Sequence, residues 1–79
     1  MGGGSMYVNV FAKFDKDGNV TPVWVEWVDG TIYEVNRIME TTVHKNKRLE
    51  TEEVCYFVQI GQRKTRLLYD KKRWSVIRR

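Results

Sequence analysis

Apolar and polar residues alternate along most of the chain, and this period of two is typical of half-buried β-strands. All even-numbered positions in residues 6–14 are apolar, and so are those in residues 54–60. In residues 20–28 the odd-numbered positions from Val23 to Trp27 are apolar. Many of these residues are β-branched or aromatic and therefore favour strands. The pattern predicts a strand in each of the three segments.

Two Asp-Gly pairs predict the first two turns, because glycine readily takes the left-handed conformation that tight turns need. Asp17-Gly18 separates the first two strands, and Asp29-Gly30 follows the second. For the second turn we expect a three-residue loop, residues 28–30, with the glycine left-handed. That loop pairs Val25 with Tyr33 and gathers apolar residues on one face, whereas a two-residue loop would bring a glutamate to that face.

The first turn also has most of the ligand spacing of a calcium-binding EF-hand loop. Asp15, Asp17, Asn19 and Glu26 fall at loop positions one, three, five and twelve. Position six of such a loop is a glycine, but here it is Val20, which resists a positive φ. Strands rather than helices are expected on both sides. The segment is therefore interpreted as a turn and not as a calcium site.

The remaining segments are less regular. A third strand is expected to begin at Thr31 and to extend toward Val43. Residues 44–53 are charged and lack an apolar period, which predicts a mobile loop with at most one helical turn. Further strands are expected at residues 65–70 and 74–78.

These elements predict an all-β fold, a small antiparallel meander of five to six strands curled into an SH3-like or Sm-like barrel. Curling the sheet lets every strand bury one face and shortens the exposed edges. The residues expected inside are Val8, Val10, Ala12, Phe14, Val23, Val25, Trp27, Tyr33, Val35, Val54, Tyr56, Val58, Ile60, Leu67, Tyr69, Trp74 and Val76.

Length and composition agree with one small globular domain. Residues 1–5 are interpreted as an expression scar and residues 6–79 as the domain. Hydrophobic residues make up 42% of the chain, which argues against disorder, yet no apolar run approaches the ~20 residues of a membrane span. A single cysteine, Cys55, cannot form an internal disulfide. Without a signal peptide, the chain is expected to be cytoplasmic and held together by packing alone.

Five segments carry a distinctive spacing of turn and core residues, namely FDKDGNVTP, WVDGTIYEVNRI, YFVQIG, LLYD and RWSV. This spacing resembles a family of small bacterial proteins, mainly of Gram-positive Firmicutes, to which no activity is assigned. The resemblance extends from Tyr7 to Val76. It implies the same meander and a bacterial cytoplasmic source, and it implies no substrate. Residues 44–53 are more charged and less glycine-rich than expected for the family, so no role of that loop is carried over.

The sequence contains no residue set typical of catalysis. Nucleophilic catalysis needs a nucleophile, a base and an orienting group, but Ser75 is the only serine after the scar and His44 the only histidine. Cys55 falls in a strand expected to be packed, where a thiol behaves as a small hydrophobe. One histidine and one cysteine cannot build a zinc site. We therefore expect a non-enzymatic protein with no metal, cofactor or small-molecule substrate.

Charge is distributed unevenly, which is the strongest functional signal. Residues 1–44 carry three basic and six acidic side chains (net −3), whereas residues 45–79 carry eleven and four (net +7). Strand directions place the connections 14–19, 44–53 and 70–73 at one end of the barrel. A basic rim at that end could follow the phosphates of a nucleic acid. Its expected residues are Lys45, Lys47, Arg48, Lys71, Lys72 and Arg73.

Large apolar residues are also expected on the outer faces of the strands. Contiguous exposed apolar residues mark a dimer or partner surface. The main hypothesis is therefore a protein-interaction module that binds a protein partner or a second copy, and nucleic-acid binding, with the outward aromatics stacking on bases, is the alternative. The residues expected to form the partner surface are Phe11, Trp24, Phe57 and Leu68.

Overall fold

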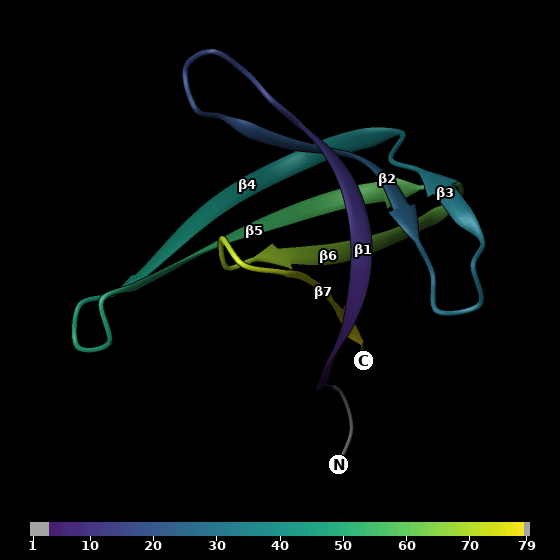
Figure 1. The fold of residues 1–79 in the computed structure, drawn as a ribbon. Helices are drawn as coiled ribbons and strands as arrows, with labels where there is room; N and C mark the ends of the chain where they lie inside the picture. The colour runs from purple at the N-terminus through teal and green to yellow at the C-terminus, as the bar shows by residue number, and fades with distance from the viewer. Residues whose placement is uncertain (1–3, 79) are drawn as a thin grey trace.

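The computed structural model describes residues 4–78 as seven β-strands (Figure 1). No helix long and apolar enough to cross a membrane occurs in this part of the chain. The predicted all-β fold is confirmed, with seven strands in place of five to six. The strands are β1 (Gly4–Phe14), β2 (Val20–Glu26), β3 (Ile32–Glu34), β4 (Arg37–Asn46), β5 (Thr51–Ile60), β6 (Arg63–Tyr69) and β7 (Trp74–Arg78).

All seven strands belong to one antiparallel sheet in the order β3-β2-β1-β7-β6-β5-β4. The first and last strands pair with each other in the middle of the sheet, for example at Met6 and Val76. The consecutive strands β3 and β4 therefore lie at opposite edges. The sheet curls so strongly that β2 and β3 pass over β4 and β5 (Figure 1), which makes the molecule a half-barrel.

The link between β3 and β4 nearly closes this half-barrel at one corner. The Val35 N–H donates to the Val23 carbonyl on β2 (2.9 Å), and the Asn36 N–H donates to the Gln59 carbonyl on β5 (2.9 Å). The Asn36 side-chain oxygen also accepts from the Gly61 N–H. The expected long third strand is therefore two strands, because it bends here to leave one edge of the sheet and join the other.

A bulge in β2 changes which residues point inward. Trp24 lies opposite Phe11, but the next pair is Pro22 with Ala12, so Val23 has no partner on β1. Pro22 is buried as a result. A bulge is one of the few places where a strand tolerates proline. Counting every second residue from Val23 to Trp27 was therefore wrong at Val23, because the extra residue shifts the inward face by one.

The core lies on the concave side of the sheet, and its centre is a column of aromatic rings. The Trp74 ring stacks on Tyr69 at 4.5 Å and on Tyr56 at 5.5 Å between centroids. The Tyr56 hydroxyl donates across the interior to the Val20 carbonyl, which ties β5 to the start of β2. The buried hydrophobic residues are Val25, Tyr56, Val58, Leu67, Trp74 and Val76.

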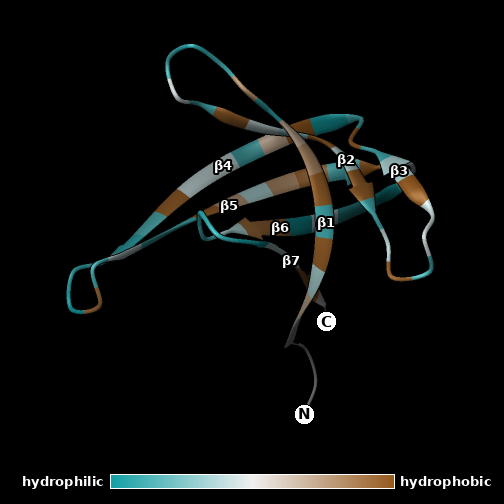
Figure 2. Ribbon diagram, viewed as in Figure 1, coloured by the Kyte–Doolittle hydropathy of each residue, from teal (hydrophilic) through white to brown (hydrophobic). Residues whose placement is uncertain are grey.

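Two residues expected inside are exposed. Phe14 is 65% exposed at the end of β1, and Tyr33 is 44% exposed on the short edge strand β3. Both predictions were wrong for the same reason. The half-barrel is open at its two ends, so inward-pointing residues near the rims are not covered. Most turn residues are hydrophilic (Figure 2), with exposed Val28 and Leu49 as hydrophobic exceptions.

The predicted register of the β2–β3 turn is confirmed. Val25 pairs with Tyr33, and the Gly30 N–H donates to the Trp27 carbonyl. Gly30 has a φ of 89°, a conformation that strongly favours glycine. Gly18 likewise has a φ of 86° in the β1–β2 turn.

Residues 44–53 do not form the expected mobile loop. They form the outer part of the β4–β5 hairpin, with strand pairing from Val43 and Val54 out to Asn46 and Thr51. The Asn46 side-chain oxygen accepts from the backbone N–H groups of Arg48 (3.1 Å) and Leu49 (3.2 Å), which caps the turn. We call residues 43–54 the arm, because they extend away from the rest of the sheet (Figure 1). Their high charge and the exposure of both faces of β4 explain why no strand was predicted here, although Glu52 and Val54 on β5 are half-buried.

Three turns are held by an aspartate carboxylate that accepts backbone N–H groups. Asp15 accepts from Asp17 and Asn19, each at 2.9 Å. Asp29 accepts from the Thr31 N–H, and Asp70 accepts from the N–H groups of Lys72 and Arg73. Backbone hydrogen bonds lower the pKa of all three carboxyls. The first turn thus uses its aspartate to shape the backbone.

These lowered pKa values predict loss of stability in acid. Each carboxylate stabilises the fold at pH values above its unfolded pKa, about 3.8, and that contribution is lost as pH falls through the lower folded pKa. We expect the melting temperature, followed by circular dichroism, to fall below pH 4. Replacing Asp15, Asp29 and Asp70 with asparagine, which keeps an oxygen acceptor, should make the melting temperature fall less steeply in acid. An unchanged fall of the melting temperature in the triple variant would contradict the prediction.

Candidate functional site

Three large hydrophobic side chains form one exposed surface on the outer side of β1, β2 and β3. Phe11 and Trp24 face each other across the β1–β2 pair, and Ile32 lies beside them on β3. The three line a shallow hollow and are 53%, 42% and 50% exposed, respectively. We call this set the aromatic surface. The bulge in β2 lies at Val23, immediately before Trp24, and leaves the direct pairing of Phe11 with Trp24 intact.

Acidic side chains border the aromatic surface. Glu34 lies opposite Trp24, and Glu26 lies opposite Ile32. The Asn9 side-chain amide donates to the Glu26 carboxylate at 2.9 Å. Lys13 lies two positions after Phe11 on β1, so the border holds two carboxylates and one cation, and its net negative charge favours a basic partner.

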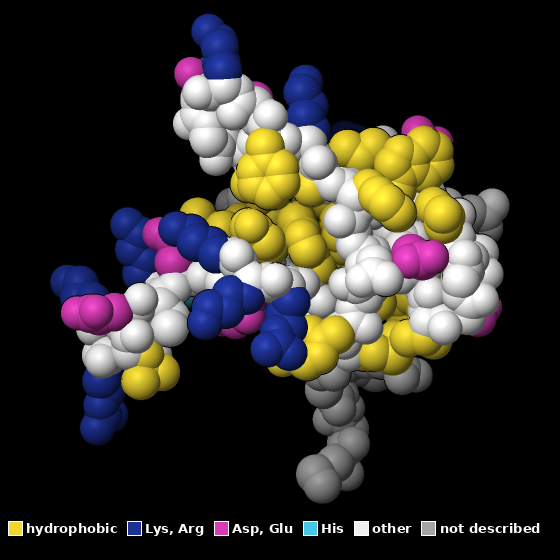
Figure 3. All heavy atoms as spheres, viewed as in Figure 1, with side chains coloured by type: hydrophobic (Ala, Val, Ile, Leu, Met, Phe, Trp, Pro, Cys, Tyr) yellow, Lys and Arg dark blue, Asp and Glu magenta, His cyan; other side chains and the backbone are white. Residues whose placement is uncertain are grey.

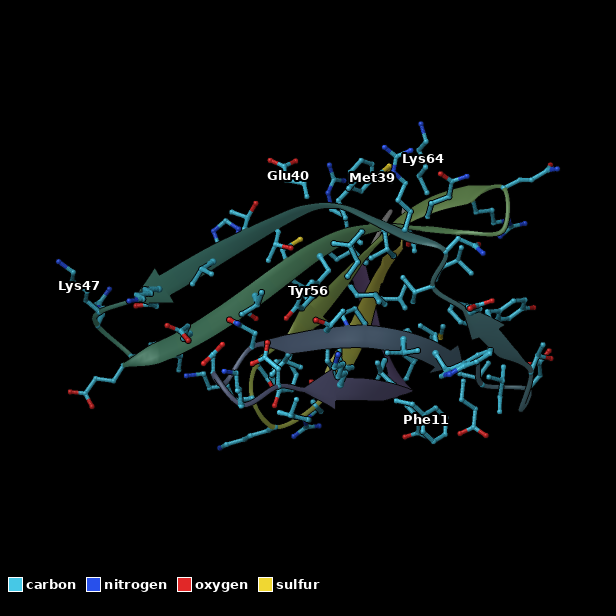
Figure 4. The ribbon with its side chains drawn as sticks, turned by 90° about the horizontal axis from the view of Figure 1, so that it is seen from above. Phe11, Met39, Glu40, Lys47, Tyr56 and Lys64 are labelled. Atoms are coloured by element: carbon cyan, nitrogen blue, oxygen red, sulfur yellow. The ribbon has the colours of Figure 1, made fainter. Side chains whose placement is uncertain are left out.

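The other two predicted partner residues lie elsewhere. Phe57 pairs with Glu40 on β4 and with Arg66 on β6. In Figure 4, Glu40 points to one side of the molecule and Phe11 to the opposite side. Leu68 is on the same outer face of β6 as Arg66. The structure thus divides the four predicted residues between two opposite faces.

The face around Phe57 is basic. The Arg66 guanidinium lies over the Phe57 ring, 5.0 Å from its centroid. Lys64 and Arg37 flank Gln59 on the neighbouring row of the same outer face. We call Arg37, Phe57, Lys64, Arg66 and Leu68 the basic face. It combines a half-buried apolar strip with three cations. These outnumber Glu40, the carboxylate opposite Phe57, so the net charge is opposite to that of the aromatic surface.

The three turns that carry the predicted basic rim lie on one side of the molecule, but the Arg73 side chain lines a hollow with Tyr7, Glu26 and Gly30 instead of joining the other cations. The β1–β2, β4–β5 and β6–β7 turns share that side (Figure 1), and Figure 3 shows Lys and Arg side chains projecting there. Lys47 and Arg48 are exposed in the turn of the arm and make no ion pair with a described carboxylate. The strand directions expected from the sequence therefore placed these turns correctly.

Part of the rim's charge is neutralised within the molecule. The Glu52 carboxylate accepts from the Lys71 ammonium at 2.9 Å and lies 3.8 Å from that of Lys45. The hydrogen bond with Lys71 lowers the pKa of Glu52 and raises that of Lys71. The Arg73 guanidinium lies over the Tyr7 ring, 4.5 Å from its centroid. Three of the six cations therefore already have partners.

The residues considered for catalysis do not meet. Cys55 is half-buried on β5, and burial raises the pKa of its thiol, which disfavours the nucleophilic thiolate. His44 is exposed on the arm, and Ser75 is buried on β7. Among residues 4–78, no group of three His, Cys, Asp or Glu side chains is placed to hold a metal ion.

A cavity that the sequence did not predict opens at the other end of the half-barrel. It has a volume of about 360 Å³ and lies between the inner faces of β2–β3 and β5–β7. We call it the mouth cavity. One signal pointed to it, since Arg63 is in phase with Thr65 and Leu67 and therefore points inward with the core. Its lining residues are Val25, Trp27, Tyr33, Ile60, Arg63, Thr65 and Val76.

No protein family, curated protein or solved structure matches this chain. The resemblance to small Gram-positive proteins and the SH3-like or Sm-like assignment therefore stay predictions. The class that the structure establishes is a small all-β, barrel-like protein.

Proposed function

We propose that the chain is a non-enzymatic interaction module that binds protein through the aromatic surface. The observation that carries the proposal is the direct pairing of Phe11 with Trp24 beside Ile32, with about half of each side chain exposed. Aromatic residues grouped in this way are typical of the residues that dominate binding energy. A bacterial cytoplasmic setting is part of the proposal and suits a chain with one half-buried cysteine.

The partner that fits best is the basic face of a second copy. Pairing two aromatic surfaces would bring Glu26 and Glu34 of one copy against the same residues of the other, and like charges oppose that arrangement. Pairing with the basic face instead opposes these carboxylates to Lys64 and Arg66, and it brings Phe57 to the apolar centre. The contact is head-to-tail, and since the two faces lie on opposite sides of the molecule, it can repeat.

Two variants that each block a different face test this proposal. Trp24→Ser removes the centre of the aromatic surface, and Arg66→Glu reverses charge on the basic face. The unmodified protein should show a mass that rises with concentration above the 9.4 kDa monomer, and each variant alone should stay monomeric. An equal mixture should form dimers, because each variant retains the face that the other lacks. Analytical ultracentrifugation measures all three.

The mixture also separates head-to-tail pairing from other arrangements. A symmetric contact between two aromatic surfaces would be lost in Trp24→Ser, untouched in Arg66→Glu, and not restored by mixing. High salt should weaken the head-to-tail contact, because the Debye length falls to about 3 Å at 1 M. A protein that stays monomeric at every concentration would exclude self-association.

Nucleic-acid binding at the basic rim is the second candidate. It is favoured by Lys47 and Arg48, whose exposed side chains have no ion pair with a described carboxylate. Binding of a labelled single-stranded oligonucleotide should weaken steeply with salt. It should be lost when Lys71, Lys72 and Arg73 are changed to glutamate.

A substitution at Glu52 gives a further test of nucleic-acid binding at the basic rim. Glu52→Gln removes the carboxylate that pairs with Lys45 and Lys71, so it should strengthen oligonucleotide binding. Fluorescence anisotropy of the labelled oligonucleotide measures the change. Unchanged or weaker binding in Glu52→Gln would count against a role of the rim in holding phosphates.

A further inference from the structure

We infer that the mouth cavity binds a small carboxylate with an aromatic or short aliphatic body. This site is separate from the aromatic surface and from the basic rim, so it does not depend on the proposed function. It departs from the expectation that the chain binds no small molecule. Four features carry the inference: where Arg63 points, what surrounds it, how large the cavity is, and which residues stay uncovered around it.

Arg63 is placed on the inner face of the sheet. It pairs with Ile60 on β5, and Thr65 and Leu67 follow at the alternate positions of β6. Leu67 is fully buried in the core, so its alternate neighbours point to the same concave side. A cation at the end of an otherwise apolar inner face is unusual, because strands normally keep charges on the solvent side.

The surroundings of Arg63 contain no described anion to neutralise it. None of the described residues lining the cavity is acidic. Arg63 makes no ion pair with a described carboxylate. A guanidinium presents a planar set of N–H donors that matches the two oxygens of a carboxylate. Thr65 and Tyr33, which also line the cavity, each carry a hydroxyl group.

The rest of the lining is apolar or aromatic. Val25 and Val76 form the buried floor, and Trp27, Tyr33 and Ile60 form the walls. The volume of about 360 Å³ lies within the range of small-molecule sites, which are mostly apolar and hold a few oriented polar groups. A ligand whose apolar body rests on the floor and whose carboxylate pairs with Arg63 would match both the apolar lining and the cation. A phosphate or other fully polar anion would leave the apolar walls without a partner.

The wall residues of the mouth cavity stay partly exposed, because no other part of the described chain covers them. Tyr33 points inward, opposite Val25, yet 44% of it is exposed. Trp27 is partly buried against the core. A ligand bound between these rings and Ile60 would cover them. Burial of apolar surface and contacts with the rings would then both contribute to binding.

Titration with 2-naphthoate tests the inference. In nitrogen-15 NMR spectra, its addition should shift the backbone amide signals of Tyr33, Ile60 and Thr65. The neutral analogue 2-naphthalenemethanol should bind at least roughly tenfold more weakly, because it lacks the charge that pairs with Arg63. Arg63→Gln should reduce naphthoate binding by a similar factor and leave binding of the alcohol unchanged.

Lys16→Gln is the matched control, since it removes the same charge from the β1–β2 turn at the other end. It should bind naphthoate as the unmodified protein does. Three results would each overturn the inference: no shifts at millimolar naphthoate, equal binding of acid and alcohol, or equal binding to Arg63→Gln. Arg63 is exposed, and a thermal melt of Arg63→Gln will verify that the variant is folded.

Discussion

Replacing Leu67 with alanine should lower the free energy of unfolding by about 2–5 kcal/mol. Leu67 has no exposed surface, and it lies on β6 between Tyr56 on β5 and Val76 on β7. All three are buried, so the neighbours cannot easily move in to fill the space left by the lost side chain. Small domains have total stabilities of about 5–15 kcal/mol, so this loss is a large fraction. Urea unfolding followed by circular dichroism measures it.

The same substitution at Leu49 is the control. Leu49 is 66% exposed in the turn of the arm, so Leu49→Ala should change stability by no more than about 0.5 kcal/mol. If the two variants were equally stable, the half-barrel would not be held by its concave core. A stability loss at Leu49 would instead indicate that the arm is covered in solution.

Local patterns in the sequence predicted the turns and pairings that depend on neighbouring residues. The register of the β2–β3 hairpin follows from Gly30 and from the need to keep Val25 and Tyr33 on one face, and the structure has that register. The bulge at Val23 was not predictable in this way. A bulge changes the inward face without breaking the strand, and nothing in the alternation marks it except Pro22 nearby.

Features that depend on distant residues were harder to predict. The pairing of β1 with β7 joins the two ends of the chain, and no local pattern indicates it. The arm was mistaken for a loop because both faces of its β4 side are exposed, so that side lacks the apolar period that marks a half-buried strand. Phe11 and Phe57 were both correctly expected outside the core, but only the curl of the sheet determines that Phe11 faces the opposite way from Glu40, the partner of Phe57.

The mouth cavity was missed for a related reason. Arg63 follows the Gly61-Gln62 turn and was counted among the cations of the basic half of the chain. Its alternation with Leu67 places Arg63 on the inner face of the sheet. An arginine can lie there because the half-barrel is open beside Trp27 and Tyr33, which only the structure reveals. Sequence periodicity gives the direction of a side chain and not the space in front of it.

Replacing Trp74 with alanine should cost about 3–5 kcal/mol and leave the protein close to unfolding at room temperature. Trp74 is 7% exposed and stacks between Tyr56 and Tyr69. Stacked aromatic pairs add about 0.5–1.5 kcal/mol to the effect of burial. Loss of the indole also frees the Tyr56 ring, whose hydroxyl bonds to the Val20 carbonyl across the open side of the half-barrel. The substitution should therefore also destabilise β2, although β2 does not pair with β7.

Trp24→Ala makes the same change on the outer surface and serves as the control. Its cross-strand contact with Phe11 is worth about 0.2–1 kcal/mol, so most of the stability should remain. Thermal unfolding followed by near-ultraviolet circular dichroism compares the two, because the signal from the stacked rings should disappear only in Trp74→Ala. The opposite ranking, with Trp24→Ala the less stable variant, would place the structural core on the outer face and remove the basis for treating the aromatic surface as free to bind.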